Sequence, residues 1–172
     1  MNKGYVHVYT GNGKGKTTAA IGLMIRAVGA GKRVYFGQFM KQGDYSEIKI
    51  LTERFPEITV VQYGGRLLLG AAAESADVRQ ARQGLTEAAE ALHSGQYDLV
   101  VLDEINVAAF LELLDIDQVA ELVSNRPAET ELVLTGRYAD KKIIDMADLV
   151  SEITQVKHYF NDGVAARPGI EM

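Results

Sequence analysis

Residues 10–18 of this chain read Thr-Gly-Asn-Gly-Lys-Gly-Lys-Thr-Thr and lie between two apolar stretches, 5–9 and 19–30. A strand, a glycine-rich turn that ends in Gly-Lys-Thr, and a helix together form the phosphate-binding loop of nucleotide-binding proteins. Small residues in the turn let backbone N–H groups surround an anion. The first turn of the helix adds further N–H groups and the positive end of the helix dipole. We therefore expect an α/β fold built around a bound polyphosphate.

The loop departs from the usual spacing at one position. Thr10 stands where the first glycine is expected, and the glycine follows at Gly11. A plain glycine turn is the alternative interpretation, but it does not account for Lys14 and Lys16 beside two threonines. Lys16 supplies a cation for the phosphates, and the hydroxyl of Thr17 is a candidate ligand for Mg²⁺. The predicted nucleotide contacts are Gly11, Asn12, Gly13, Lys14, Gly15, Lys16, Thr17 and Thr18.

Apolar segments that read as strands alternate with helical patterns along the whole chain. This alternation is typical of a parallel sheet with helices on both faces. We predict one P-loop NTPase-like (RecA-like) α/β domain over residues 1–172, with a mostly parallel sheet. The helix at 17–30 is apolar nearly all round and is expected to be buried, and the tail from residue 161 is expected to be irregular. Strands are expected at 5–9, 33–40, 58–63, 99–103, 131–135 and 149–156, and helices at 17–30, 46–55, 77–94, 105–114, 117–125 and 140–146.

Two carboxylates follow an apolar run in the middle of the chain, where residues 98–104 read Asp-Leu-Val-Val-Leu-Asp-Glu. Ligands of parallel sheets bind at the carboxyl ends of the strands, so Asp103 and Glu104 should face the phosphate-binding loop. Mg²⁺ commonly binds one or two carboxylates together with phosphates. Both residues are therefore candidate Mg²⁺ ligands, and a helix cap before Ile105 is the alternative for Asp103.

Three cationic residues are further candidates. Arg137 follows the fifth expected strand, where its charge can lie over the phosphates. Lys41 follows the second expected strand and either binds a ligand or is a solvated loop charge. Arg26 is the single charge in the helix at 17–30; it contacts the nucleotide or a partner subunit, or its head reaches water.

Composition narrows the classes of partner. The net charge of −5 argues against general binding to nucleic acids or anionic membranes. Cysteine is absent, which excludes disulfides, thiolate metal sites and cysteine nucleophiles. The first residues form no apolar signal segment and no apolar run has membrane length, so a cytoplasmic protein is expected.

Beyond the loop, the chain resembles the ATP:corrinoid adenosyltransferases of the P-loop type almost end to end. The loop without its first glycine is itself the variant that this family carries. The segments that carry the resemblance are residues 11–20, 26–29, 38–41, 97–108, 134–137, 147–150, 156–158 and 169–171. Most specific are Asp103-Glu104-Ile105-Asn106-Val107-Ala108, and the pair Lys157-His158 followed by Gly169-Ile170-Glu171.

The resemblance implies a reaction in which the Co(I) centre of a corrinoid attacks the 5′-carbon of ATP and the whole triphosphate leaves. It also implies that the triphosphate lies reversed relative to ordinary P-loop enzymes. Co(I) is already a strong nucleophile, so the protein must hold the geometry and stabilise the leaving polyanion. Lys16 and Arg137 are the expected catalytic residues, together with Mg²⁺. The family further implies a homodimer and a flavoprotein reductant that supplies Co(I).

The segment after the third strand departs from the family. Its members carry an aromatic residue there that faces the corrin, whereas this chain has Leu67, Leu68 and Leu69 in a glycine-rich loop. We expect these leucines to pack against the corrinoid; the alternatives are a partner surface or a place in the core.

Two other functions fit a phosphate-binding loop alone. A small ATPase or nucleoside kinase is one; a kinase needs a base for its acceptor and usually an arginine-rich lid, and the sequence offers no such segment. A nucleotide-sensing module without chemistry is the other. The products formed from ATP distinguish them: triphosphate for an adenosyltransferase, diphosphate for an ATPase or kinase, and none for a sensor.

Overall fold

A single parallel sheet forms the centre of the molecule. The computed structural model describes residues 3–43, 45–64 and 75–171. Among these residues the strands are β1 (Val6–Thr10), β2 (Val34–Phe39), β3 (Ile58–Tyr63), β4 (Leu99–Asp103), β5 (Glu131–Thr135) and β6 (Leu149–Glu152). Their order across the sheet is β3-β2-β4-β5-β1-β6, and every neighbouring pair is parallel. The predicted parallel sheet is confirmed.

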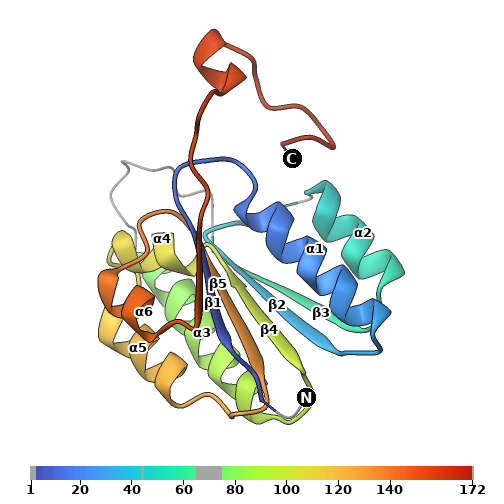
Figure 1. Cartoon of the computed structure of the whole chain (residues 1–172), viewed down its shortest axis with the longest axis vertical. Coiled ribbons are helices and arrows are strands. Elements are labelled where there is room, and N and C mark those ends of the chain that lie inside the picture. The colour runs from blue at the N-terminus through green and yellow to red at the C-terminus, as the bar shows by residue number, and fades with distance from the viewer. Residues whose placement is uncertain (1–2, 44, 65–74, 172) are drawn as a thin grey trace.

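Helices cover both faces of the sheet, as predicted (Figure 1). One face carries α1 (Lys16–Gly29) and α2 (Ser46–Arg54), and the other carries α3 (Ser75–His93), α4 (Ile105–Phe110), α5 (Ile116–Ser124) and α6 (Lys141–Met146). The apolar run of β4 serves both layers, because Val100 and Leu102 pack toward α3 and α5 whereas Leu99 and Val101 pack toward α1 and α2. A strand that is covered on both faces reads as a continuous apolar run, as this one does.

The prediction that the first helix is buried all round was wrong. Only Lys16, Ala20 and Met24 of α1 are buried, and Ile25 and Arg26 are exposed. Since α1 lies on one face of the sheet, one stripe of the helix meets strands and the rest faces water. Its small residues, alanine and glycine, raised the apolar count without adding a second buried face.

Two element ends and the tail differ from the sequence prediction by more than two residues or in kind. Helix α4 ends at Phe110 rather than near residue 114, because the chain turns there through Glu112, which has a left-handed φ of 57°. Strand β6 ends at Glu152 rather than at residue 156, because its neighbour β1 ends at Thr10, the partner of Glu152, and the chain then meets the phosphate-binding loop. The tail contains a short 3-10 helix, η1 (Tyr159–Asp162). The leucines at 67–69 lie outside the described residues.

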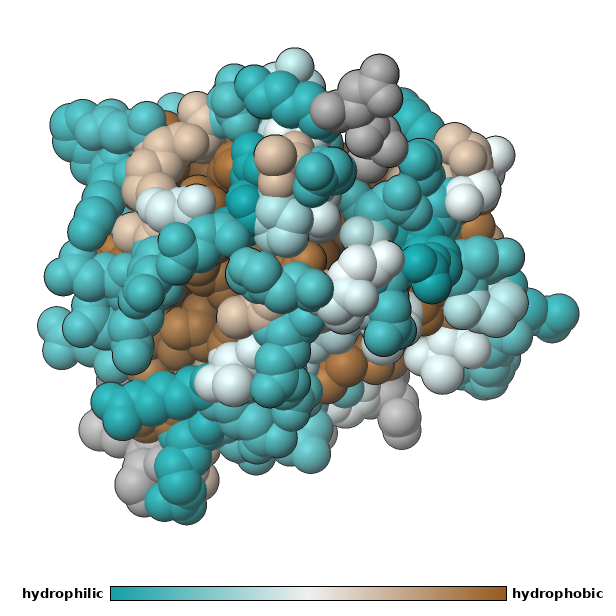
Figure 2. Space-filling model, turned by 90° about the horizontal axis from the view of Figure 1, so that it is seen from below, coloured by the Kyte–Doolittle hydropathy of each residue, from teal (hydrophilic) through white to brown (hydrophobic). Residues whose placement is uncertain are grey.

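The end of the molecule at the amino ends of the strands is mostly hydrophilic. Figure 2 shows this end, with hydrophobic residues visible mainly in recesses between polar side chains. None of the helices in the described ranges is long and apolar enough to span a membrane.

Candidate active site

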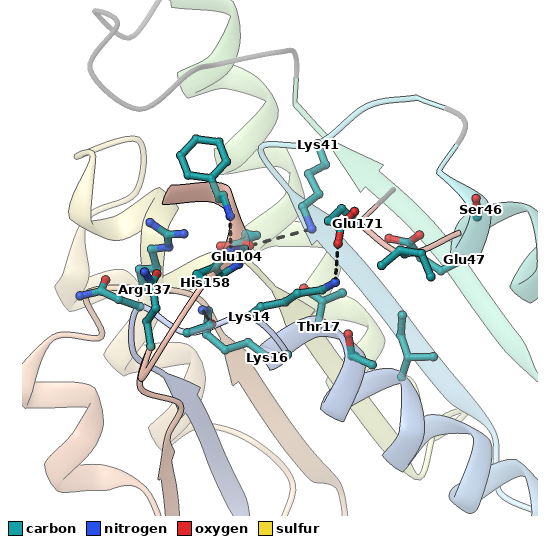
Figure 3. Close-up of a pocket in the computed structure, with 18 of the residues that line it drawn as sticks. Lys14, Lys16, Thr17, Lys41, Ser46, Glu47, Glu104, Arg137, His158 and Glu171 are labelled. Atoms are coloured by element: carbon teal, nitrogen blue, oxygen red, sulfur yellow. Dashed lines mark hydrogen bonds and ion pairs between the residues drawn. The ribbon is translucent and has the colours of Figure 1, made fainter. Parts of the chain in front are cut away.

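An open cavity of about 660 Å³ lies at the carboxyl ends of the strands (Figure 3). Its walls come from the phosphate-binding loop and α1, from the residues that follow β2, β4 and β5, and from the C-terminal segment. The predicted residues that line it are Asn12, Gly13, Lys14, Gly15, Lys16, Thr17, Thr18, Lys41, Glu104 and Arg137. The fold therefore brings together, in one cavity, residues that are far apart in the sequence.

The glycines at the start of the loop are required by a close backbone neighbour. Gly13 N–H donates to the carbonyl of Ile153 at 2.7 Å. A Cβ on Gly11 or Gly13 would lie 2.5 or 2.7 Å from that same oxygen, closer than non-bonded atoms approach. Thr10 is tolerated in place of the usual first glycine because it is the last residue of β1, so the turn begins one residue later.

Lys16 is folded back onto the loop. It is the first residue of α1 and is buried, and its Nζ donates to the carbonyl oxygens of Gly11 and Gly13, each at 2.8 Å. Burial, and the nearby charges of Arg137 and Lys41, lower the pKa of Lys16 although the neighbouring carboxylates oppose the shift. An anion in the cavity would meet an ammonium group that already lies at the loop.

Asp103 forms the buried polar centre beneath the cavity. One carboxylate oxygen accepts hydrogen bonds from Thr17 Oγ1 at 2.8 Å and Thr135 Oγ1 at 2.6 Å. The other accepts from Gln38 Nε2 at 3.0 Å and Lys41 Nζ at 3.1 Å. Burial favours the neutral acid, but the Lys41 charge and these hydrogen bonds outweigh it, so the pKa of Asp103 lies below its usual value. The carboxylate thereby fixes the hydroxyl of Thr17.

Glu104 lines the cavity directly beside this centre. Its backbone is left-handed, with a φ of 61°, and its N–H donates to Thr135 Oγ1 at 3.1 Å. Burial and the charge of Asp103 raise the pKa of Glu104, against the opposing charges of Lys41, Lys16 and Arg137. Its carboxylate lies 3.9 Å from Lys41 Nζ. Because burial and Asp103 both disfavour the ionised form of Glu104, a further cation bound beside it would stabilise that form.

Strained backbone is found at this edge of the sheet. Met40 follows β2, Glu104 follows β4 and Tyr138 follows β5, and all three have a φ near 60°. Non-glycine residues adopt this conformation at an energetic cost, and such residues cluster at functional sites. Their location agrees with a binding role for the carboxyl edge of the sheet.

The oxygen donors suit Mg²⁺ that is shared with phosphates. Within the described ranges, no cluster of three or more histidine, aspartate or glutamate residues has the arrangement of a metal site. Mg²⁺ usually keeps waters and takes only one or two protein oxygens beside phosphate oxygens. The Thr17 hydroxyl and the Glu104 carboxylate, both at the cavity, match that pattern.

Some residues are placed differently from expectation, and others were missed. Arg26 is exposed on α1 and does not line the cavity. Sequence reasoning gave no separate site role to Ser46, Glu47, Gln155, His158, Phe160, Ile170 or Glu171, all of which line it. For His158, Ile170 and Glu171 the only sequence signal was that they lie in the C-terminal segments, 156–158 and 169–171, which carry the resemblance.

Comparisons with known proteins agree over nearly the whole chain. A profile of the family described as ATP:corrinoid adenosyltransferase BtuR/CobO/CobP matches residues 2–172. The chain is similar to the corrinoid adenosyltransferase of Escherichia coli K12, with 36% identity over 171 residues, covering 98% of this chain and 86% of that protein. It is 35% identical over 170 residues to that of Pseudomonas aeruginosa, covering 98% of this chain and 84% of that protein.

Among solved structures, the fold is similar to that of a KaiC-like protein from Pyrococcus horikoshii. The TM-score is 0.63 at 18% sequence identity, and the match covers 91% of this chain and 75% of that chain. This likeness confirms the predicted P-loop NTPase-like fold and shows the fold alone.

Proposed function

Because the chain belongs to the ATP:corrinoid adenosyltransferase family, we propose that the cavity at the carboxyl edge of the sheet holds ATP for adenosyl transfer to a corrinoid. The protein is an adenosyltransferase whose substrates are ATP and a corrinoid. One observation carries the assignment of the site. Lys14, Lys16, Lys41 and Arg137 all line one cavity in a protein whose net charge is −5.

These cations suit the chemistry of the leaving group. An electron pair of Co(I) forms the bond to the 5′-carbon of ATP, and the bond from that carbon to the phosphate oxygen breaks. The released pair of electrons leaves on the triphosphate, so negative charge grows at the phosphates in the transition state. Lys16 and Arg137 are the proposed catalytic residues, because cations fixed where charge develops stabilise it.

Mg²⁺ would be held by the Thr17 hydroxyl and the Glu104 carboxylate. Bound there, it would neutralise part of the triphosphate charge. Asp103 was predicted from the sequence as a further metal ligand. The Asp103 carboxylate is fully buried and each of its oxygens accepts two hydrogen bonds, so we propose that it orients Thr17 and holds Lys41 instead.

Glu104→Gln is expected to raise the Mg²⁺ concentration for half-maximal activity by about tenfold, because a neutral amide binds a hard divalent cation less well than a carboxylate does. The measurement is a Mg²⁺ titration of activity, with thermal melting as a check on folding. Glu121→Gln, an exposed carboxylate on α5, is the control. An unchanged Mg²⁺ dependence would return Glu104 to a structural role.

The assignment of the cavity is tested by the products. With ATP, Mg²⁺ and a chemically reduced corrinoid, we expect equal amounts of adenosylated corrinoid and triphosphate. Release of diphosphate would indicate an ATPase or kinase instead. Loss of both products on substitution of the cavity residues, with the fold intact, would support the site.

We further propose a homodimer and a flavoprotein that reduces the corrinoid to Co(I), both of which the family suggests, and a cytoplasmic location, which the sequence predicted. Light scattering tests the first, and reduction of the bound Co(II) corrinoid by a purified flavoprotein tests the second. The roles of Arg26 and of the leucines at 67–69 remain predictions.

A further inference from the structure

The last residues of the chain cross over the phosphate-binding loop. This C-terminal strap, residues 153–171, leaves β6 and rises above the carboxyl edge of the sheet (Figure 1). It begins at Ile153, which accepts from the N–H of Gly13, and it reaches the cavity again through its final residues, Gly169 to Glu171. Both ends of the strap therefore lie at the loop.

Glu171 ties the end of the strap to the loop. One of its carboxylate oxygens accepts from Lys14 Nζ at 2.8 Å and from Arg167 at 3.2 Å, and it also accepts a hydrogen bond from the hydroxyl of Tyr159. The other oxygen accepts from the backbone N–H of Arg167 at 2.9 Å and from its Nε at 3.2 Å. Figure 3 shows Glu171 pointing toward Lys14 across the cavity wall.

The charges of this cluster do not cancel. Glu171 is paired with two cations, so Lys14, Arg167 and Glu171 together keep one positive charge. Arg167 and Lys14 hold the pKa of Glu171 well below its usual range, which keeps the carboxylate ionised. The Glu171 side chain is only 15% exposed, whereas that of Lys14 is 38% exposed. Glu171 is the more buried partner, and the lysine remains accessible to a ligand.

We propose that Glu171 is a positioning residue, which holds Lys14 at the cavity so that its ammonium group meets the triphosphate of ATP. The proposal rests on the proposed function. A free lysine on an exposed loop has many rotamers, and ordering it on binding reduces affinity. A carboxylate that fixes Lys14 beforehand removes part of that loss. Tyr159 supports the arrangement, since its hydroxyl accepts from Lys14 at 3.0 Å as well as donating to Glu171.

If Glu171 instead competed with the phosphates, its removal would change the affinity for ATP in the opposite direction. A carboxylate that only occupies the place of a phosphate would compete with ATP, and its removal would strengthen nucleotide binding. A positioning carboxylate strengthens nucleotide binding through Lys14, and its removal weakens it. The direction of change in affinity therefore separates the two.

Glu171→Gln is expected to weaken the binding of ATP and of inorganic triphosphate by about three- to tenfold, because a charge-assisted contact is lost at a partly exposed site. Calorimetry on the full-length protein gives both dissociation constants. In steady state the KM for ATP should rise, and the KM for the corrinoid should stay constant. Asp145→Asn is the matched control, because Asp145 also forms an i, i+4 ion pair, with Lys141, away from the cavity.

A double-mutant cycle tests whether the effect passes through Lys14. Lys14→Gln alone should weaken triphosphate binding, and adding Glu171→Gln to that variant should cause no further loss. Unchanged or tighter binding by Glu171→Gln, or equal losses with and without Lys14, would overturn the proposal. If the wild-type protein binds neither ATP nor triphosphate, the proposed function itself fails, which is a different result.

Discussion

Lys16→Ala is expected to lower kcat/KM for ATP by about a hundredfold or more, which is the usual effect of removing one preorganised group that stabilises developing charge. The Lys16 ammonium group is buried at the start of α1 and lies against the carbonyls of Gly11 and Gly13. A triphosphate would offer it a stronger, charged acceptor at the same place. Adenosylation rates with a chemically reduced corrinoid, measured over a range of ATP concentrations, give kcat/KM for each protein.

The control for this variant is Lys49→Ala, an exposed lysine on α2. Its activity should match that of the wild-type protein. Lys16 also donates hydrogen bonds to two carbonyls of the loop, so its removal can destabilise the fold. Thermal melting distinguishes that loss of stability from a loss of catalysis. A Lys16→Ala protein that is folded and as active as the wild type would disprove the role of this loop in triphosphate binding.

Asp103→Asn is expected to combine a large loss of stability with a large loss of activity. The carboxylate is fully buried and accepts four hydrogen bonds, one of them from the Lys41 ammonium group. An amide has only one accepting oxygen, and its NH₂ group would face donors. Breaking a buried ion pair by removing one partner costs about 3–5 kcal/mol of folding free energy. Urea unfolding near pH 7 measures it, and activity should fall because Thr17 loses its fixed orientation.

The difference in unfolding free energy between wild type and Asp103→Asn is expected to depend on pH. The pKa of Asp103 is depressed in the folded state, so the ionised carboxylate stabilises the protein above its unfolded pKa, about 4. That contribution is lost as the pH falls from about 4 through the lower folded pKa. The stability gap between wild type and Asp103→Asn should therefore narrow in acid. A gap that stays constant, or an Asp103→Asn protein as stable as the wild type, would contradict the assignment; Asp145→Asn is the control.

Most of the architecture could be predicted because the strands, the loop and the helices are marked by patterns of neighbouring residues in the sequence. The strand, loop and helix around Lys16 are contiguous in the sequence, and the apolar run before Asp103 marks a strand covered on both faces. Parallel topology then places both at one edge of the sheet. Those two local signals were enough to bring Lys16, Thr17, Asp103 and Glu104 into one predicted site.

The rest depended on contacts that no local pattern encodes. Glu171 meets Lys14 across more than 150 residues of sequence. Nothing in the residues around either predicts that pairing. Similarly, β6 ends early because β1, beside which it lies, ends at Thr10 and turns into the loop, which strand propensity does not reveal. The exposed side of α1 was missed for another reason: hydrophobic content does not reveal how many faces of a helix meet a neighbour.

The position of β1 in the sheet affects when this chain can fold during its own translation. Its two neighbours are β5 and β6, which come from the last part of the chain. During translation the phosphate-binding loop leaves the ribosome first, but its strand lacks both neighbours until residues 131–152 have been made. Non-local pairing of this kind slows folding. Nucleotide that binds this loop can therefore stabilise the fold only after residues 131–152 have been made and paired with β1.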